Sequence, residues 1–123
     1  MGKFSFNKGE RLKKEKLIEG LFSKGASFTI YPFRVIYLSN PQPNSFHQVL
    51  FTASSRNFKK AVDRNKIKRR TREAYRLNKA CLDETPKLLI GFVYIAKELQ
   101  DYDQIEKAVV KALDKLKKAE PKA

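Results

Sequence analysis

The chain has little of the chemistry on which protein active sites are most often built. Its 123 residues include one cysteine, one histidine and no tryptophan. Cys81 cannot form an internal disulfide, and with His47 it cannot supply the ligand set of a zinc site. A nucleophilic pair of Cys81 and His47 would require the two to meet only in the folded chain. We therefore expect no catalytic or metal site in the protein, and interpret Cys81 as a small residue near a helix end.

Long hydrophobic runs are also absent. The longest, residues 88–96, has nine residues, which is under half of the roughly 20 that cross a bilayer as a helix. The N-terminus carries Lys3 and reaches polar residues from Asn7 onward, without the apolar stretch of a secretory signal. We expect a cytoplasmic protein with no membrane partner.

Acidic residues are few beside the basic ones. The chain has 27 Lys and Arg against 13 Asp and Glu, a formal net charge of +14. Residues 56–79 hold eleven cations and two acids, whereas residues 80–123 hold eight of each sign. Apolar residues form 41% of the chain, so we expect one folded domain over 1–123 with a frayed tail at 119–123. Such a concentration of charge on one segment indicates a surface for a polyanion.

Hydrophobic periodicity predicts seven elements in the order αβββαβα. A helix is expected over 13–24 with Gly25 as its C-terminal cap, and Gly20 inside it suggests close approach of another group or a helix held by tertiary packing. Pro32 should divide residues 26–38 into two strands. A loop over 40–45, a strand over 48–53, a helix over 62–79 and a strand over 88–96 follow.

The last predicted helix begins at Asp101 or Asp103, either of which can cap it. Apolar residues recur there at steps of three and four from Ile105 to Leu116. The whole order predicts an α+β fold, a single-domain two-layer sandwich in which three helices accompany a small, mostly antiparallel four-stranded sheet.

The helix expected over 62–79 is strongly asymmetric. At about 100° per residue, six cations and one amide share an arc of about 140°: Arg64, Asn65, Lys68, Arg69, Arg72, Arg76 and Lys79. Its predicted core face holds Ile67, Thr71, Ala74 and Leu77. A solvated face would interleave Glu and Lys, and a membrane-surface helix would need a larger apolar face. Because arginine holds phosphate by two hydrogen bonds, the arc favours nucleic acid as its partner.

Residues 61–76, AVDRNKIKRRTREAYR, closely resemble the signature of the protein subunit of bacterial ribonuclease P. That signature has an RNRIKR core followed by REA(F/Y)R. Residues 11–14 and 21–25 look like the opening helix of the family and residues 93–97 like its central strand, so the resemblance covers roughly residues 8–118. This chain departs from the pattern at Lys66, usually Arg, at Ser54 and Ser55, where a Lys is common, and at Ile18, often Phe.

The resemblance implies a ribonucleoprotein endonuclease that removes the 5′ leader from precursor tRNA. The implied catalyst is the RNA subunit, which binds Mg²⁺, while the protein subunit is non-catalytic and binds no cofactor alone. It would bind the catalytic RNA and the precursor leader, and broaden the tolerance for substrate and Mg²⁺, with no obligatory protein partner. The implied fold includes a left-handed β-α-β crossover, against the usual right-handed rule.

The resemblance also assigns residues to two RNA-binding regions. Contact with the RNA subunit is implied for Arg56, Arg64, Asn65, Lys66, Lys68, Arg69, Arg72 and Arg76. A cleft between the first helix and the sheet would hold the single-stranded leader and would be lined by Lys13, Ile18, Phe22, Val35 and Tyr37. Val35 and Tyr37 share a strand face by the period of two. Simple core packing of Phe22 and Tyr37 is the alternative.

Two other functions stay open from the residues alone. A ribosomal protein or DNA-binding module could use the same basic arc, and a DNA reader would prefer duplex DNA over structured RNA at matched salt. A nuclease made only of protein would need converging carboxylates. Asp63 and Glu73 lie ten residues apart in the basic helix, so cleavage without any RNA would be needed to support that reading.

Two substitutions test the motif. Arg69→Ala should clearly weaken binding to the cognate catalytic RNA because it removes a bidentate phosphate partner. Lys66→Arg should have a modest effect because the charge is kept. Equilibrium binding of the full chain measures both, and equal affinities for wild type and the two variants would show that the arc is not the docking surface.

Overall fold

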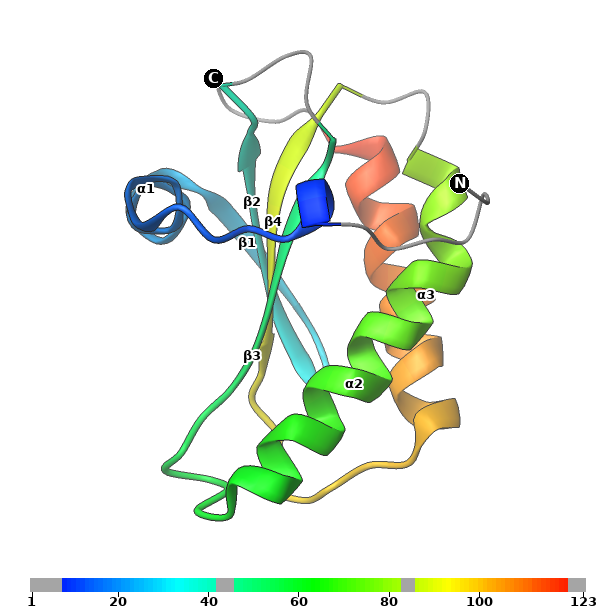
Figure 1. The fold of residues 1–123 in the computed structure, drawn as a ribbon. Helices are drawn as coiled ribbons and strands as arrows, with labels where there is room; N and C mark the ends of the chain where they lie inside the picture. The colour runs from blue at the N-terminus through cyan, green and yellow to red at the C-terminus, as the bar shows by residue number, and fades with distance from the viewer. Residues whose placement is uncertain (1–7, 42–45, 83–85, 120–123) are drawn as a thin grey trace.

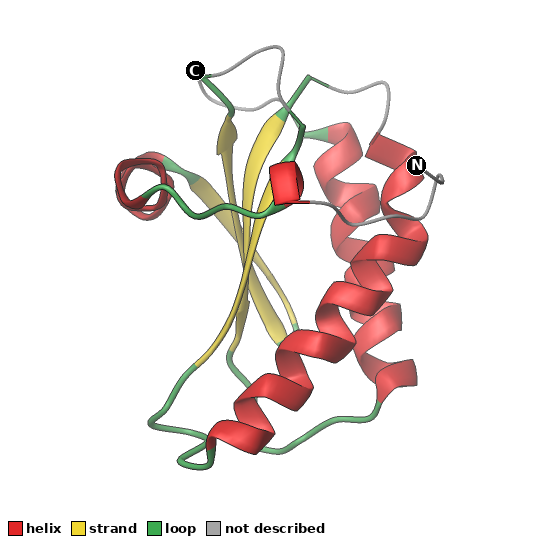
Figure 2. Cartoon of the chain, viewed as in Figure 1, coloured by secondary structure: helices red, strands yellow, loops and turns green. Residues whose placement is uncertain are grey.

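The computed structural model describes residues 8–41, 46–82 and 86–119 (Figures 1 and 2). The predicted order αβββαβα and the α+β fold are confirmed, with two short 3-10 helices added. The residues 42–45 of the predicted loop and 120–123 of the predicted frayed tail lie outside the described residues. The elements are η1 Lys8–Glu10, α1 Glu15–Lys24, β1 Ala26–Ile30, β2 Phe33–Ser39, β3 Gln48–Ala53, α2 Ala61–Asn78, η2 Lys79–Leu82, β4 Leu88–Tyr94 and α3 Tyr102–Lys118.

The four strands form one sheet in the order β1-β2-β4-β3. The pairs β1/β2 and β2/β4 are antiparallel and β3/β4 is parallel, so the sheet is mostly antiparallel as expected. Helices α2 and α3 cover one face of the sheet, which completes the sandwich, and α1 lies across the opposite face (Figure 1).

The connection from β3 through α2 to β4 has an unusual hand. In Figure 1 β3 passes in front of its neighbour β4, both strands run downward, and α2 rises on the right between them in the chain. This path is a left-handed crossover, whereas nearly all β-α-β connections are right-handed. As a result the basic helix α2 packs on the sheet beside its edge strand β3.

The main core lies between the sheet and the pair α2 and α3, and aromatic rings fill its centre. The Phe92 ring on β4 lies 5.7 Å from that of Phe33, 5.8 Å from that of Phe51 and 6.2 Å from that of Tyr75, measured between centroids. A smaller cluster on the other face joins α1 to the sheet and contains Leu12, Leu21, Ile36 and Leu89. Strand β4 is buried along nearly its whole length, as expected for a central strand covered on both faces.

The core face of α2 differs from the predicted one at one position. Ile67, Thr71 and Ala74 are buried as expected, but Tyr75 is the fourth buried residue and Leu77 is 38% exposed. Tyr75 is drawn inward because its ring reaches the aromatic cluster on β3 and β4. The predicted helical period of α2 is therefore correct, but the centre of its predicted buried face lies some tens of degrees around the helix axis from the observed centre.

His47 is buried and joins three parts of the backbone. The Leu88 amide donates to its Nδ1 (3.1 Å), which leaves the Nε2–H to donate to the Leu82 carbonyl (2.8 Å). These bonds tie the start of β3 to the end of η2 and the start of β4. Cys81 is in η2, near a helix end as expected, and is exposed.

The first helix begins two residues later than expected, at Glu15, and its two glycines have different surroundings. Gly25 caps the helix with an extended backbone (φ −69°, ψ 149°). A Cβ there would lie 2.5 Å from the Leu21 carbonyl oxygen and 2.8 Å from Cγ2 of Ile36. The close approach of both α1 and β2 therefore requires glycine at this position. A Cβ on Gly20 would meet nothing within 4 Å, so the close approach suggested by the sequence is wrong for that residue.

These two glycines give a matched pair of stability tests. Gly25→Ala should destabilise the protein by about 1–3 kcal/mol because backbone atoms must move to admit the methyl group. Gly20→Ala should stabilise it by about 0.5–1 kcal/mol, since the site is open and alanine is the better helix former. Urea unfolding of each variant measures both effects, and a loss of stability in Gly20→Ala would contradict this account.

Candidate nucleic-acid interface

Three segments meet at the β3 edge of the sheet and line an open surface pocket of about 180 Å³. The segment before α1, the strand β3 and the basic helix α2 each contribute to it. Four cations surround a mostly apolar floor. The lining residues are Arg11, Leu12, Lys13, Val49, Leu50, Phe51, Lys68 and Arg72. This arrangement suits a ligand with both phosphates and flat apolar groups.

The segment that carries Arg11 and Lys13 is extended and runs beside β3. The Leu12 amide donates to the Val49 carbonyl (3.1 Å), and Arg11 forms a parallel bridge with Val49. Alternation along the extended chain buries Leu12 in the smaller cluster and leaves Arg11 and Lys13 exposed on the other side. The pattern basic, apolar, basic at residues 11–13 is thus the sequence signal of this segment.

On the other side of the pocket, Lys68 and Arg72 lie one turn apart on α2. Both are half-buried. Between them and the N-terminal segment lies Phe51, whose ring stacks on that of Phe92 at an interplanar angle of 17°. The floor of the pocket is thus anchored in the main core. Like charges at this spacing destabilise a helix by a few tenths of a kcal/mol per pair, so a bound anion would offset that repulsion.

Three arginines of the motif, Arg64, Arg70 and Arg76, donate hydrogen bonds within the protein. Arg70 donates to the Gln100 carbonyl (2.6 Å), which ties α2 to the segment before α3. The Arg64 guanidinium donates to the carbonyls of Phe58 (2.7 Å) and Lys59 (3.0 Å), which secures the turn before α2. Arg76 forms an ion pair with Glu73 one turn before it. The hydrogen bond from Arg76 lowers the pKa of Glu73, and the same contact raises the pKa of Arg76. The cations of the motif are therefore not equivalent.

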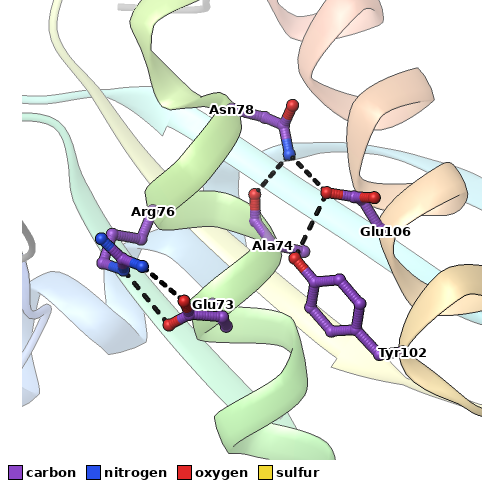
Figure 3. A network of polar contacts seen from close by, with 6 residues as sticks. All are labelled: Glu73, Ala74, Arg76, Asn78, Tyr102 and Glu106. Carbon is purple, nitrogen blue, oxygen red and sulfur yellow. Dashed lines mark hydrogen bonds and ion pairs between the residues drawn. The ribbon is translucent and has the colours of Figure 1, made fainter. Parts of the chain in front are cut away.

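The Arg76 pair is next to a polar network that joins α2 to α3 (Figure 3). The side-chain amide of Asn78 donates to the Ala74 carbonyl (2.8 Å) and to a Glu106 carboxylate oxygen (3.3 Å). The Tyr102 hydroxyl donates to the same oxygen (3.2 Å). Burial, followed by the Glu106 charge, raises the pKa of Tyr102. These contacts fix the C-terminal half of α2 against α3.

The other predicted RNA-binding residues point in several directions. Asn65 and Arg69 are exposed on α2, and Lys66 is half-buried. Lys66 and Lys68 lie about 160° apart around the helix, so they cannot face one shallow surface together. Arg56 is exposed in the turn between β3 and α2, where its amide donates to Ser54 Oγ (3.0 Å). Of the eight predicted residues, Lys68 and Arg72 line the pocket.

Only some of the residues predicted to line the leader cleft lie on the same side of the sheet. Ile18 is half-buried against the smaller cluster and Phe22 is 47% exposed, both on α1. Lys13 lines the pocket. Val35, however, is 0% exposed in the main core, and Tyr37 packs on that same core beside Phe28. The placement of these last two residues beside α1 is wrong, because their strand face is directed toward α2 and α3.

The face of the sheet on the α1 side carries residues that the sequence analysis missed. Strand alternation directs Arg34 to the same face as Ile36, which packs under α1. The strand register places Arg34 opposite Val93, which in turn lies opposite Thr52. Arg34 is exposed and the other two are half-buried. In the sequence, Arg34 could have been noticed as an isolated cation within an apolar strand. Nothing in the sequence distinguishes Leu50 and Phe51 of the pocket from ordinary strand residues.

The comparisons with known proteins decide the family. The family model described as Ribonuclease P matches residues 6–117. The chain belongs to the Ribonuclease P family. The Ribonuclease P protein component of Porphyromonas gingivalis is 35% identical over 116 residues, which span 89% of this chain and 85% of that protein. The one from Petrotoga mobilis is 35% identical over 119 residues, spanning 91% and 95%.

A solved structure supports the same assignment within the Ribonuclease P family. The RNase P protein of Staphylococcus aureus matches with a TM-score of 0.71 at 25% identity, over 89% of this chain and 95% of that one. Across residues 8–41, 46–82 and 86–119, no helix is long and apolar enough to cross a membrane. No group of three or more His, Cys, Asp or Glu side chains suited to a metal ion gathers in that part of the chain.

Substitutions at Phe22 and Val35 test which face of the sheet binds RNA. Phe22→Ala should leave the free energy of unfolding within about 0.5 kcal/mol of wild type but weaken binding of single-stranded RNA by about 1 kcal/mol or more through lost stacking. Val35→Ala should cost about 1–3 kcal/mol of stability by leaving a cavity, with unchanged RNA affinity below its unfolding temperature. Urea unfolding and equilibrium binding at fixed salt measure the two, and the reverse pattern would restore Val35 to the binding face.

Proposed function

We propose that this chain is the protein component of a ribonucleoprotein ribonuclease P, which removes the 5′ leader from precursor tRNA to give the mature 5′ end. The observation that carries the proposal is the pocket in which Arg11 and Lys13 meet Lys68 and Arg72 over an apolar floor. Two distant segments thus present cations to one small volume, where phosphates would bind. Membership of the Ribonuclease P family supplies the reaction.

In this proposal the protein is a non-catalytic RNA-binding subunit, and the RNA subunit is the catalyst that holds Mg²⁺. The cations of α2 and of residues 11–13 lie beside RNA phosphates and neutralise them. Binding of each phosphate releases condensed counterions, which favours assembly at moderate salt. The protein would therefore raise the affinity for the precursor and lower the Mg²⁺ concentration that the reaction requires.

The precursor leader is proposed to lie on the face of the sheet beside α1. Ile18 and Phe22 of α1 border this face, and Arg34 stands exposed on it next to Val93. A single strand suits such a surface because its bases can stack on apolar and aromatic side chains while its phosphates meet cations. The expected partners are the catalytic RNA and precursor tRNA, and a cytoplasmic location stays a prediction.

Reconstitution tests this function. The isolated protein should not cleave precursor tRNA, whereas adding it to the cognate catalytic RNA at low Mg²⁺ should produce rapid leader removal. Lys68→Ala combined with Arg72→Ala should reduce that stimulation strongly, because two phosphate contacts in the pocket are lost. Gel analysis of the 5′ cleavage product measures the rate.

The matched control combines Lys107→Ala with Lys111→Ala, which removes the same charge from exposed positions on α3. It should stimulate like wild type. No stimulation by the wild-type protein would contradict the proposed function. Cleavage by the protein without RNA would favour a protein nuclease, and preference for duplex DNA over structured RNA at matched salt would favour a DNA-binding module.

A further inference from the structure

A buried ion pair joins the N-terminal segment to the end of α2. The Lys79 ammonium contacts the Glu10 carboxylate across 69 positions of sequence. The side chains are only 15% and 7% exposed, respectively, so this pair is far more buried than the Lys118–Asp114 pair on the surface of α3. Breaking a buried pair leaves an uncompensated charge and is costly.

The pair is placed where it can control the pocket. Glu10 ends η1 and immediately precedes Arg11, while Lys79 is the C-cap of α2. Two hydrogen bonds hold the same segment to β3: Gln48 Nε2 donates to the Gly9 carbonyl (3.2 Å), and the Leu12 amide donates to the Val49 carbonyl (3.1 Å). The ion pair adds an attachment to α2 itself.

That attachment opposes a repulsion built into the pocket. Arg11 and Lys13 on one side line the same small volume as Lys68 and Arg72 on the other. The four like charges repel one another, and water screens this repulsion less at the half-buried Lys68 and Arg72 than at the exposed Arg11 and Lys13. In the absence of RNA this repulsion acts to drive the segment away from α2. The contact between Glu10 and Lys79 is attractive across the same two elements and offsets it.

We infer that Glu10 and Lys79 are positioning residues for RNA binding, which hold Arg11 and Lys13 beside Lys68 and Arg72 without touching the RNA. The inference rests on the proposed function and adds to it two residues outside the set that binds RNA. It explains why an acidic residue stands directly before the basic pair in a strongly basic chain. Preorganising the four cations in this way reduces the ordering cost of binding.

The test uses Glu10→Lys, for which the inference and a simple count of charges predict opposite results. The variant gains two positive charges, so general attraction to RNA would tighten binding. Loss of positioning should instead weaken binding to the cognate catalytic RNA by about tenfold. The negative slope of log K against log salt should also become shallower, its magnitude decreasing by about 1.4–1.8, the contribution of two phosphate contacts. Glu10→Gln, which should fold more readily, should show the same changes to a smaller degree.

Two controls separate positioning from charge and from folding. Asp114→Lys adds the same two charges at an exposed position on α3 and should bind as tightly as wild type or slightly more tightly. The double variant Glu10→Lys with Lys79→Glu restores an attractive pair at the wild-type net charge. It should recover both the affinity and the salt slope.

A third experiment tests whether the Glu10–Lys79 pair acts through Arg11 and Lys13. In a chain that already carries Arg11→Ala and Lys13→Ala, Glu10→Lys should cause no additional loss, because the cations it positions are gone. Hydrogen exchange without RNA gives an independent readout. The Leu12 amide should exchange faster in Glu10→Lys, while the Ile105 amide, bonded to the Asp101 carbonyl in α3, should be unchanged.

The outcomes are distinct. Weaker binding, a shallower slope and rescue by the charge swap would support the inference. Binding by Glu10→Lys and Glu10→Gln with the affinity and slope of wild type would overturn it and leave the proposed function intact. Failure of the wild-type protein to bind the catalytic RNA would overturn the proposed function and this inference with it, while the Leu12 exchange would still show whether the pair holds the segment.

Discussion

The packing of α2 on the aromatic centre of the sheet is the constraint on which the rest of the structure depends. A helix with so many like charges repels itself, and what holds it is the burial of one narrow face. Ile67 and Ala74 are buried, and the Tyr75 ring meets the rings of Phe51 and Phe92. Since apolar burial stabilises by roughly 25 cal/mol per Å², one such face can outweigh several unfavourable charge pairs.

That packing also sorts the cations of the motif into different tasks. Arg64 donates to backbone carbonyls in the turn before the helix, and Arg76 is paired with Glu73 on the helix itself. Lys68 and Arg72 stand over the β3 edge, where the N-terminal segment brings further positive charge. The proposed binding surface therefore lies where two elements converge, and in this proposal the residues that hold the two elements together contribute to binding along with those that face the RNA.

Much of the fold could be predicted because it follows from local pattern. Hydrophobic periodicity and turn residues correctly placed the strand at 48–53 and the two strands on either side of Pro32. The residue that caps α3, Asp101, was one of the two candidates from the sequence. The leader cleft was only half predictable. Period two shows that Val35 and Tyr37 share a face, but it does not show which helices cover that face. For the same reason Leu77 was predicted on the buried face of α2 in the place that Tyr75 occupies. The helical period shows which residues share a face, but the elements packed around the helix decide which face is buried.

The sequence by itself determined the family, the order of the elements, the helix that bears the charge and the polyanionic nature of its partner. These depend on residue type and local spacing. Only the tertiary structure decided that residues 11–13 lie beside α2, that Lys79 is matched by Glu10, and that the face beside α1 carries Arg34. Those contacts join segments far apart in the chain, and their geometry is set by how a left-handed crossover places α2 at the edge of the sheet.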